Sequence, residues 1–131
     1  MIRMCHSIKI HKEKKLAQIT AEGKVTVLEL KEIFLETIEH EDWLPGFNML
    51  CDYSNIEDFD VTTGDMEDIT EWQSSIDALI GAGRCAVVAC KDSVYGMSRM
   101  WEIISSERSQ QICVFRQMND AVTWLGSILF I

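Results

Sequence analysis

The sequence of 131 residues contains a single proline and seven glycines, too few for a collagen-like or low-complexity protein. It also lacks a long apolar run. The longest such stretch, residues 121–131, is interrupted by polar residues and is too short to cross a bilayer. The first ten residues alternate polar and apolar side chains, and we therefore expect no signal peptide there. With 47% hydrophobic and 25% charged residues, the composition predicts one globular domain over residues 1–131.

The five cysteines form no C-x-x-C pair, which is the spacing of many zinc sites and redox dithiols. Four of them, Cys51, Cys85, Cys90 and Cys113, fall in runs that we interpret as buried strands. Disulfides are rare in reducing compartments, and an odd cysteine count without a signal peptide fits such a compartment. We therefore expect a soluble, cytoplasmic protein.

Basic residues are scarce in the middle of the chain. The formal net charge is −9, and residues 25–80 hold 15 acidic residues against the single base Lys31. The only basic cluster lies within residues 9–15 and is broken by Glu13, whereas nucleic-acid-binding proteins usually carry a basic stripe. The sequence therefore predicts an acidic surface from the middle third of the chain and no nucleic-acid partner.

Hydrophobic spacing predicts alternating strands and helices. Residues 7–13 and 16–22 alternate as two strands of a hairpin. Further strands are expected at residues 47–53, 84–90 and 111–116, and helices at residues 27–40, 62–80, 94–106 and 119–125. The order ββαβαβαβα predicts an α/β fold with a single mixed, mostly parallel sheet, an N-terminal β-hairpin and about four helices.

Three residues are predicted to begin helices. Thr26 and Thr62 each precede an acidic residue by three positions, the pattern in which a hydroxyl and a carboxylate bind each other's backbone N–H groups. Asn119 is expected to cap the last helix. Residues 57–60, just before the second of these helix starts, are predicted to form an acidic loop.

The element order, together with Leu50-Cys51-Asp52-Tyr53-Ser54 and Asp60-Val61-Thr62-Thr63-Gly64, resembles the STAS domain of sulfate transporters and anti-sigma factor antagonists. The similarity is greatest to its bacterial SpoIIAA-like branch, which is also compared with the CRAL-TRIO lipid-binding fold. The run Arg84-Cys85-Ala86-Val87-Val88-Ala89 and the sequence A-V-T-W-L at residues 121–125 are similar to the same branch. The resemblance covers nearly the whole chain.

That resemblance implies a regulatory, protein-binding role. In regulatory members an Asp ends the central strand, and a second Asp precedes a phosphorylatable Ser at a helix start. Asp52 and Asp60 match the two aspartates, but Val61 follows, and Thr62 reaches the phosphoacceptor place only if one residue is inserted. A plain N-cap is the preferred interpretation of Thr62. We expect a partner-reading surface over residues 52–71. Its partner-binding or switch residues are Asp52, Ser54, Asp58, Asp60, Thr62 and Thr63.

The tryptophans and methionines offer an alternative function. Most are expected to fill the core, as methionine often does. The lipid-binding comparison implies instead that some line an apolar cavity for a small ligand or lipid, with Met66, Met97, Met100 and Trp101 as the candidates. Some of these side chains and the apolar tail, residues 128–131, would be covered between two copies in a homodimer.

No catalytic group, cofactor or metal is predicted. Asp58 and Asp60 begin a D-x-D calcium pattern that fails at Thr63, where a glycine is required. The three histidines lie in the first hairpin and at the end of the first helix, away from the carboxyl ends of the later strands. We therefore expect a non-enzymatic domain, and an enzyme that uses Asp52 or Asp60 as a base is the least favoured hypothesis.

Overall fold

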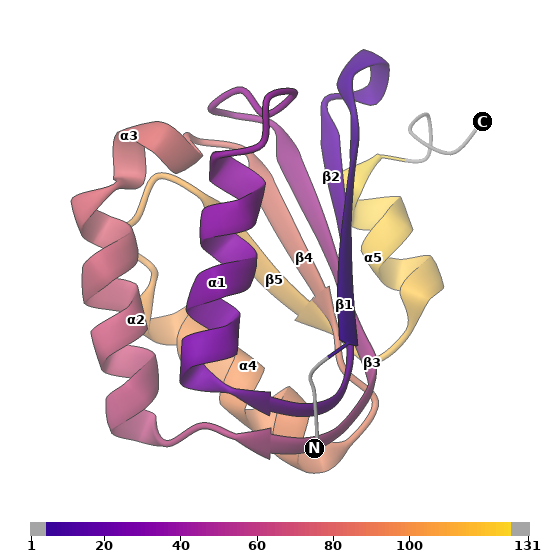
Figure 1. Cartoon of the computed structure of the whole chain (residues 1–131). Helices are drawn as coiled ribbons and strands as arrows, with labels where there is room; N and C mark the ends of the chain where they lie inside the picture. Colours follow the sequence, from indigo (N-terminus) through magenta and orange to yellow (C-terminus); the bar gives the residue numbers. More distant parts are fainter. Residues whose placement is uncertain (1–4, 127–131) are drawn as a thin grey trace.

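The computed structural model describes residues 5–126 and contains one five-stranded sheet in the order β1-β2-β3-β4-β5 (Figure 1). The first two strands form an antiparallel hairpin around the 3-10 turn η1 (Lys12–Lys14), and each later strand runs parallel to its neighbour. The predicted mixed, mostly parallel sheet is thus confirmed. The strands are β1 (Cys5–His11), β2 (Leu16–Thr26), β3 (Asn48–Asp60), β4 (Arg84–Val88) and β5 (Gln111–Phe115).

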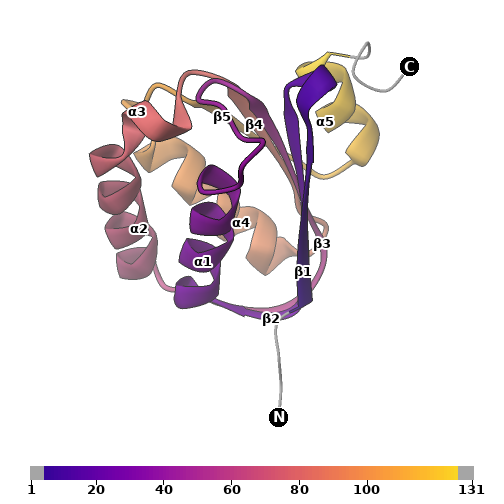
Figure 2. The same ribbon diagram turned by 45° about the horizontal axis from the view of Figure 1, so that its top comes forward.

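Helices connect the parallel strands. Figures 1 and 2 show α1, α2 and α4 on one face of the sheet and α5 on the other. The predicted order ββαβαβαβα is confirmed, with α2 and α3 forming one helical connection. The helices are α1 (Val27–Ile38), α2 (Thr63–Ser75), α3 (Asp77–Ile80), α4 (Asp92–Ile104) and α5 (Met118–Leu125).

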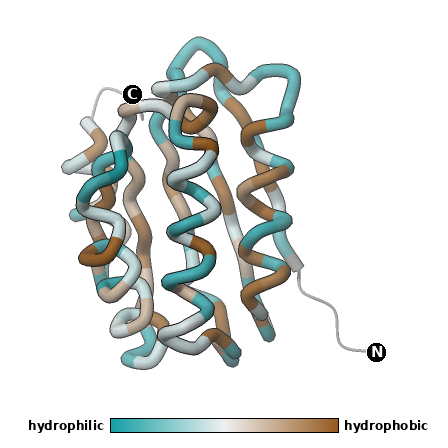
Figure 3. Tube along the Cα trace, turned by 90° about the vertical axis from the view of Figure 1, so that its left-hand side faces the viewer, coloured by the Kyte–Doolittle hydropathy of each residue, from teal (hydrophilic) through white to brown (hydrophobic). Residues whose placement is uncertain are grey.

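Strand alternation divides the core into two clusters, because successive side chains point to opposite faces of a sheet. Under α1, α2 and α4 the sheet contributes fully buried residues such as Ile19, Met49 and Val87. The smaller cluster under α5 contains Leu50 and Val88. Figure 3 shows hydrophobic and hydrophilic residues alternating along the helices that face the viewer, as expected for helices that cover a sheet on one side.

Both threonines are N-caps as predicted, but within the described residues the reciprocal bond expected from the Glu29 carboxylate to Thr26 is absent. Thr26 Oγ1 accepts from the backbone N–H of Glu29 at 3.4 Å, and Thr62 begins α2 with a reciprocal capping box. The third predicted cap, Asn119, is wrong. Gln117 is the N-cap and keeps an extended backbone, and α5 begins one residue later with Met118, which packs against the cluster under this helix.

The predicted acidic loop at residues 57–60 is also wrong, because β3 continues as a strand to Asp60. β2 is likewise longer than expected and pairs its last residues with this extension, so that Thr26 lies opposite Asp60. Ile56 is 1% exposed and Phe59 packs against the core, which anchors the extension while its charged residues face outward.

The helix predicted to run to Ile80 breaks at Ile76, which leaves the helical conformation with φ −118° and ψ 23°. Asp77 then begins α3 and accepts hydrogen bonds from the backbone N–H and the hydroxyl of Ser109. The break leaves Leu79 of α3 54% exposed.

The strand predicted at residues 84–90 ends at Val88, two residues early. Cys90 is therefore exposed, contrary to the expectation of a buried strand residue, and Cys113 is only half-buried. Cys51 and Cys85 are buried as predicted.

Candidate functional site

The predicted partner-reading surface begins where the sheet narrows. Asp52 lies opposite Val88 and is the last β3 residue paired with β4. Beyond it, within the described residues, β3 pairs only with β2, and Figure 2 shows the two strands curving past the rest of the sheet. This two-stranded extension leads directly into the starts of α1 and α2.

At the near end of the extension, the Asp52 side chain accepts hydrogen bonds from Ser54 within the strand. Asp52 Oδ1 accepts from the backbone N–H of Ser54 at 3.1 Å and from the Ser54 hydroxyl. An open hollow of about 520 Å³ lies beside Ser54. On its wall Lys91 Nζ donates to the backbone carbonyl of Glu57 at 2.7 Å. This lysine therefore binds the backbone of the extension.

At the far end, Asp60, Thr62 and Thr63 lie exposed around the start of α2. The Thr62 hydroxyl accepts from the backbone N–H of Asp65 at 3.1 Å, and Asp65 Oδ2 accepts from the backbone N–H of Thr62 at 2.9 Å. Asp58, also exposed, lies opposite Lys24 of β2. The hydroxyl and the carboxylate thus fix the helix start.

The six predicted residues therefore do not form one cluster. Asp52 and Ser54 lie at one end of the extension, whereas the two threonines lie at the other. Asp60 follows Asp52 by eight positions of extended chain, which corresponds to roughly 25 Å along the strand. The acidic residues of this segment are thus spread along the extension and α2, and we call residues 52–71 the acidic face.

A groove between α1 and α2 borders this face, and sequence analysis did not predict it. Its volume is about 210 Å³. Lys31 Nζ lies 4.8 Å from the centre of the Trp72 ring, and Leu28 at the start of α1 is 65% exposed. Hydrophobic spacing predicts each helix separately and does not show which residues remain uncovered between two helices. The lining residues are Val27, Leu28, Lys31, Asp65, Asp68, Ile69 and Trp72.

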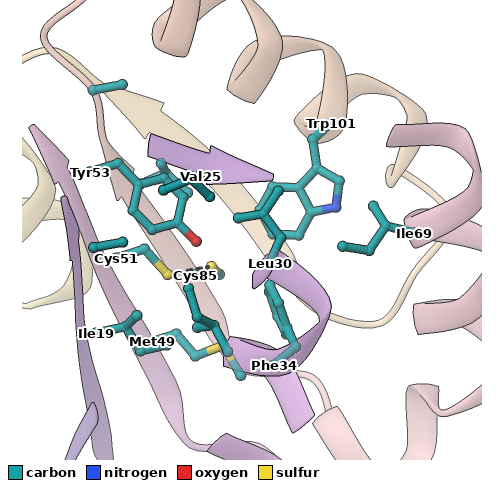
Figure 4. Packing of buried hydrophobic residues seen from close by; sticks show 14 of the residues in the cluster. Ile19, Val25, Leu30, Phe34, Met49, Cys51, Tyr53, Ile69, Cys85 and Trp101 are labelled. Carbon is teal, nitrogen blue, oxygen red and sulfur yellow. Dashed lines mark hydrogen bonds between the residues drawn. The ribbon is translucent and has the colours of Figure 1, made fainter. Parts of the chain in front are cut away.

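The candidate apolar-ligand residues lie around a small internal cavity. Met66 and Trp101 line it, whereas Met97 and Met100 do not. Its volume is about 20 Å³, which is room for about one water molecule. Figure 4 shows Trp101 and Ile69 packed at this side of the core. A lipid would fit only if the helices moved apart.

Two thiols and a phenol meet in the core. Cys51 Sγ and Cys85 Sγ are 3.9 Å apart, and Figure 4 shows the hydroxyl end of Tyr53 directed toward them. The hydrogen bond with Cys85 and burial raise the pKa of Cys51 well above its ordinary value. Burial also raises the pKa of Tyr53. Both groups are therefore neutral, and a neutral buried thiol is a poor nucleophile.

A buried arginine, also missed by sequence analysis, joins α2 to the loop after α4. Arg108 donates to Gln73 Oε1 at 3.3 Å and to Gln110 Oε1 at 3.2 Å, and its Nε lies 3.9 Å from Asp77 Oδ1. Trp101 Nε1 donates to the same Gln73 oxygen at 2.9 Å. Burial lowers the pKa of Arg108. The polar composition of residues 105–110 gave no reason to expect a buried cation there.

No three His, Cys, Asp or Glu side chains within residues 5–126 are placed to hold one metal ion. No helix of this part of the chain combines the length and apolar character needed to cross a membrane. The apolar tail expected at a dimer interface, residues 128–131, lies outside the described residues.

A solved structure has the same architecture. It is an uncharacterized protein of the DUF3478 family from Shewanella loihica PV-4, described as having a SpoIIAA-like fold, and it matches this chain with a TM-score of 0.57 and 15% sequence identity over 93% of each chain. This chain has a SpoIIAA-like fold. The resemblance that the sequence predicted is thus confirmed at the level of the fold. No protein-family profile matches the sequence, and no curated protein matches it.

Proposed function

We propose that this SpoIIAA-like domain is a non-enzymatic regulatory module that binds a basic surface of a partner protein through its acidic face, residues 52–71. One observation carries the proposal. These residues include eight acidic side chains and no lysine or arginine, and six of the eight are exposed on the β3 extension and on α2. Like charges gathered on one face attract a partner of opposite charge and increase its rate of association.

The chemistry of the region supports binding over catalysis. The Asp52 carboxylate accepts hydrogen bonds from Ser54, and the Asp65 carboxylate caps α2. Both carboxylates therefore have local structural roles. The proposal includes a cytoplasmic location, which is supported by the unlinked thiols of Cys51 and Cys85.

The proposal does not include a phosphate switch at Thr62. Its hydroxyl already accepts a backbone hydrogen bond from Asp65, and the Asp65 carboxylate lies in the same capping box. A phosphate would add a charge of roughly −2 beside this carboxylate, and like charges repel. The face is therefore proposed to act in its unmodified form.

Affinity capture from a lysate of the native host tests the acidic face. The variant Asp58→Asn/Asp60→Asn/Glu67→Gln/Glu71→Gln removes four exposed charges from the face. The control Glu39→Gln/Glu41→Gln/Glu107→Gln/Asp120→Asn removes four exposed charges elsewhere. We expect the control and the wild-type chain to retain a partner that the first variant loses, and we expect added salt to weaken the complex. Equal capture by both variants would refute the proposal.

A further inference from the structure

We propose that the groove between α1 and α2 receives an amphipathic helix of the partner protein, which inserts a leucine-sized side chain into the groove and surrounds it with lysine or arginine. This inference rests on the proposed function and specifies the chemistry of the partner. Helix-in-groove recognition of this kind places apolar anchors at helical spacing into a hydrophobic groove.

The groove has an apolar floor and an uncovered edge. Ile69, at 4% exposure, and the half-buried Trp72 contribute from α2, and Val27 contributes from α1. Leu28 stands at the edge with 65% of its surface exposed. Because both helices follow parallel strands, they run in the same direction, and a third helix can lie along the groove between them.

The charges around the groove indicate which charge the partner segment carries. α1 and α2 together contain seven acidic residues and a single base, Lys31. Lys31 Nζ lies over the Trp72 ring at 4.8 Å, which is a cation–π distance. Asp65 and Asp68 line the groove as fixed negative charges. The complementary ligand is therefore apolar at its centre and basic at its margins.

The interior beneath the groove can adjust to a docked side chain. Ile69 lines both the groove and the internal cavity of about 20 Å³. An inserted side chain therefore contacts a residue that has free space on its inner side, and a small shift of Ile69 can improve the fit without moving the sheet.

The test uses the full chain and a synthetic helical peptide of about 16 residues, long enough to form a helix. The peptide carries leucines at positions i, i+4 and i+7 and lysines at the remaining outward positions. A control peptide has alanines in place of the leucines and the same charge. In an NMR titration we expect chemical-shift changes centred on Leu28, Lys31, Asp68 and the indole N–H of Trp72. We expect the alanine peptide to bind at least about tenfold more weakly than the leucine peptide.

Two matched variants locate the site. Leu28→Ser is expected to lower the affinity for the leucine peptide by about tenfold, because the docked leucine side chain loses contact with the exposed Leu28. Leu79→Ser removes a leucine of similar exposure, 54%, from α3 and is expected to leave binding unchanged. Equal binding of the two peptides, or shifts centred on Leu79, would overturn the inference. The inference would also be overturned if a fatty acid shifted the NMR signals of Met66 and Trp101 while the leucine peptide shifted none.

The lysate capture separates this inference from the proposed function. If the acidic-face variant loses the partner and Leu28→Ser retains it, the groove is not the docking site, although the acidic face still binds. If neither variant loses the partner, the proposed function fails. Loss in both variants, with retention by Leu79→Ser, supports both proposals.

Discussion

The Thr62 hydroxyl accepts from the Asp65 backbone N–H, and the Asp65 carboxylate accepts from the Thr62 backbone N–H, with nitrogen-to-oxygen distances of 3.1 Å and 2.9 Å. These contacts satisfy two backbone N–H groups that a helix otherwise leaves without a partner. They also join the end of the β3 extension to the helix that carries much of the acidic face.

The first prediction concerns this cap. Thr62→Ala removes the hydroxyl acceptor and is expected to lower the free energy of unfolding by about 1 kcal/mol. Thr63→Ala replaces the neighbouring exposed threonine, which is not the N-cap. This variant is expected to change the free energy of unfolding by less than about 0.5 kcal/mol. Urea denaturation measures both values. Equal losses in the two variants would contradict the role given to Thr62.

The second prediction concerns modification at the same place. We expect the protein purified from its native host to have the intact mass of the unmodified chain, because Thr62 is occupied as a helix cap beside the Asp65 carboxylate. Mass spectrometry checks this. A phosphorylated species that disappears in Thr62→Ala would contradict the prediction and restore a phosphate switch.

The third prediction concerns the polar network under α2. Gln73 Oε1 accepts from both Trp101 Nε1 and Arg108 Nη1, and Gln73 is fully buried. Gln73→Leu keeps the shape but leaves two buried donors unpaired, one of them charged, and is expected to cost about 3 kcal/mol in stability. Gln111→Leu is the control on an exposed site. If Gln73→Leu left the stability unchanged, water or another group would have to replace the amide as hydrogen-bond acceptor.

The fourth prediction is a loss of stability in alkaline solution. Folding raises the pKa values of Cys51 and Tyr53, so that the unfolded chain releases these protons at a lower pH than the folded chain does. Their contribution to stability is complete below the unfolded cysteine pKa of about 8.5. The cysteine contribution is lost above this pH and the tyrosine contribution only above the unfolded tyrosine pKa of about 10, each by about 1.4 kcal/mol per pH unit.

Urea denaturation at several pH values from about 7 to about 10 measures this loss. Cys51→Ala is expected to be less stable overall but to lose little stability across this range, because the tyrosine contribution falls only above about pH 10. A wild-type chain whose stability stays constant across this range would contradict the prediction.

The fifth prediction concerns the contact between two loops at the opposite end of the sheet. Gly81 has φ +83°, and a Cβ placed there would lie 2.2 Å from the backbone nitrogen of Gly46. Gly46 has φ +94° but open space around it. Both alanine variants require a positive φ, which costs about 1–3 kcal/mol, and Gly81→Ala adds a backbone clash. Thermal denaturation should show a clearly larger loss for Gly81→Ala. Equal losses would show that the loops separate easily.

Local sequence patterns were sufficient to predict the arrangement of the sheet. The capping residues Thr26 and Thr62 mark the changes from strand to helix, and the apolar run of residues 85–89 marks a buried strand. Single helices between strands require parallel pairing. The β3 extension could not be predicted in this way. Glu57, Asp58 and Asp60 are typical of a loop, and they lie in a strand because β2 offers a partner for their backbone.

The candidate site was predictable in its charge but not in its shape. The acidic residues of the middle third are visible in the sequence, and the fold exposes most of them. Whether Leu28 is covered depends on how far α1 stands from α2, and no single helix carries that information. The burial of Arg108 likewise depends on Gln73 and Gln110, which are distant from each other in the sequence.

The position of Ile69, shared between the surface groove and the internal cavity, has a consequence for how this fold can diversify. A shorter side chain at this one position would join the two spaces into a channel that opens to solvent. Descendants of this sequence could therefore acquire a chamber for small molecules by a change on one helix, with every strand and crossover kept.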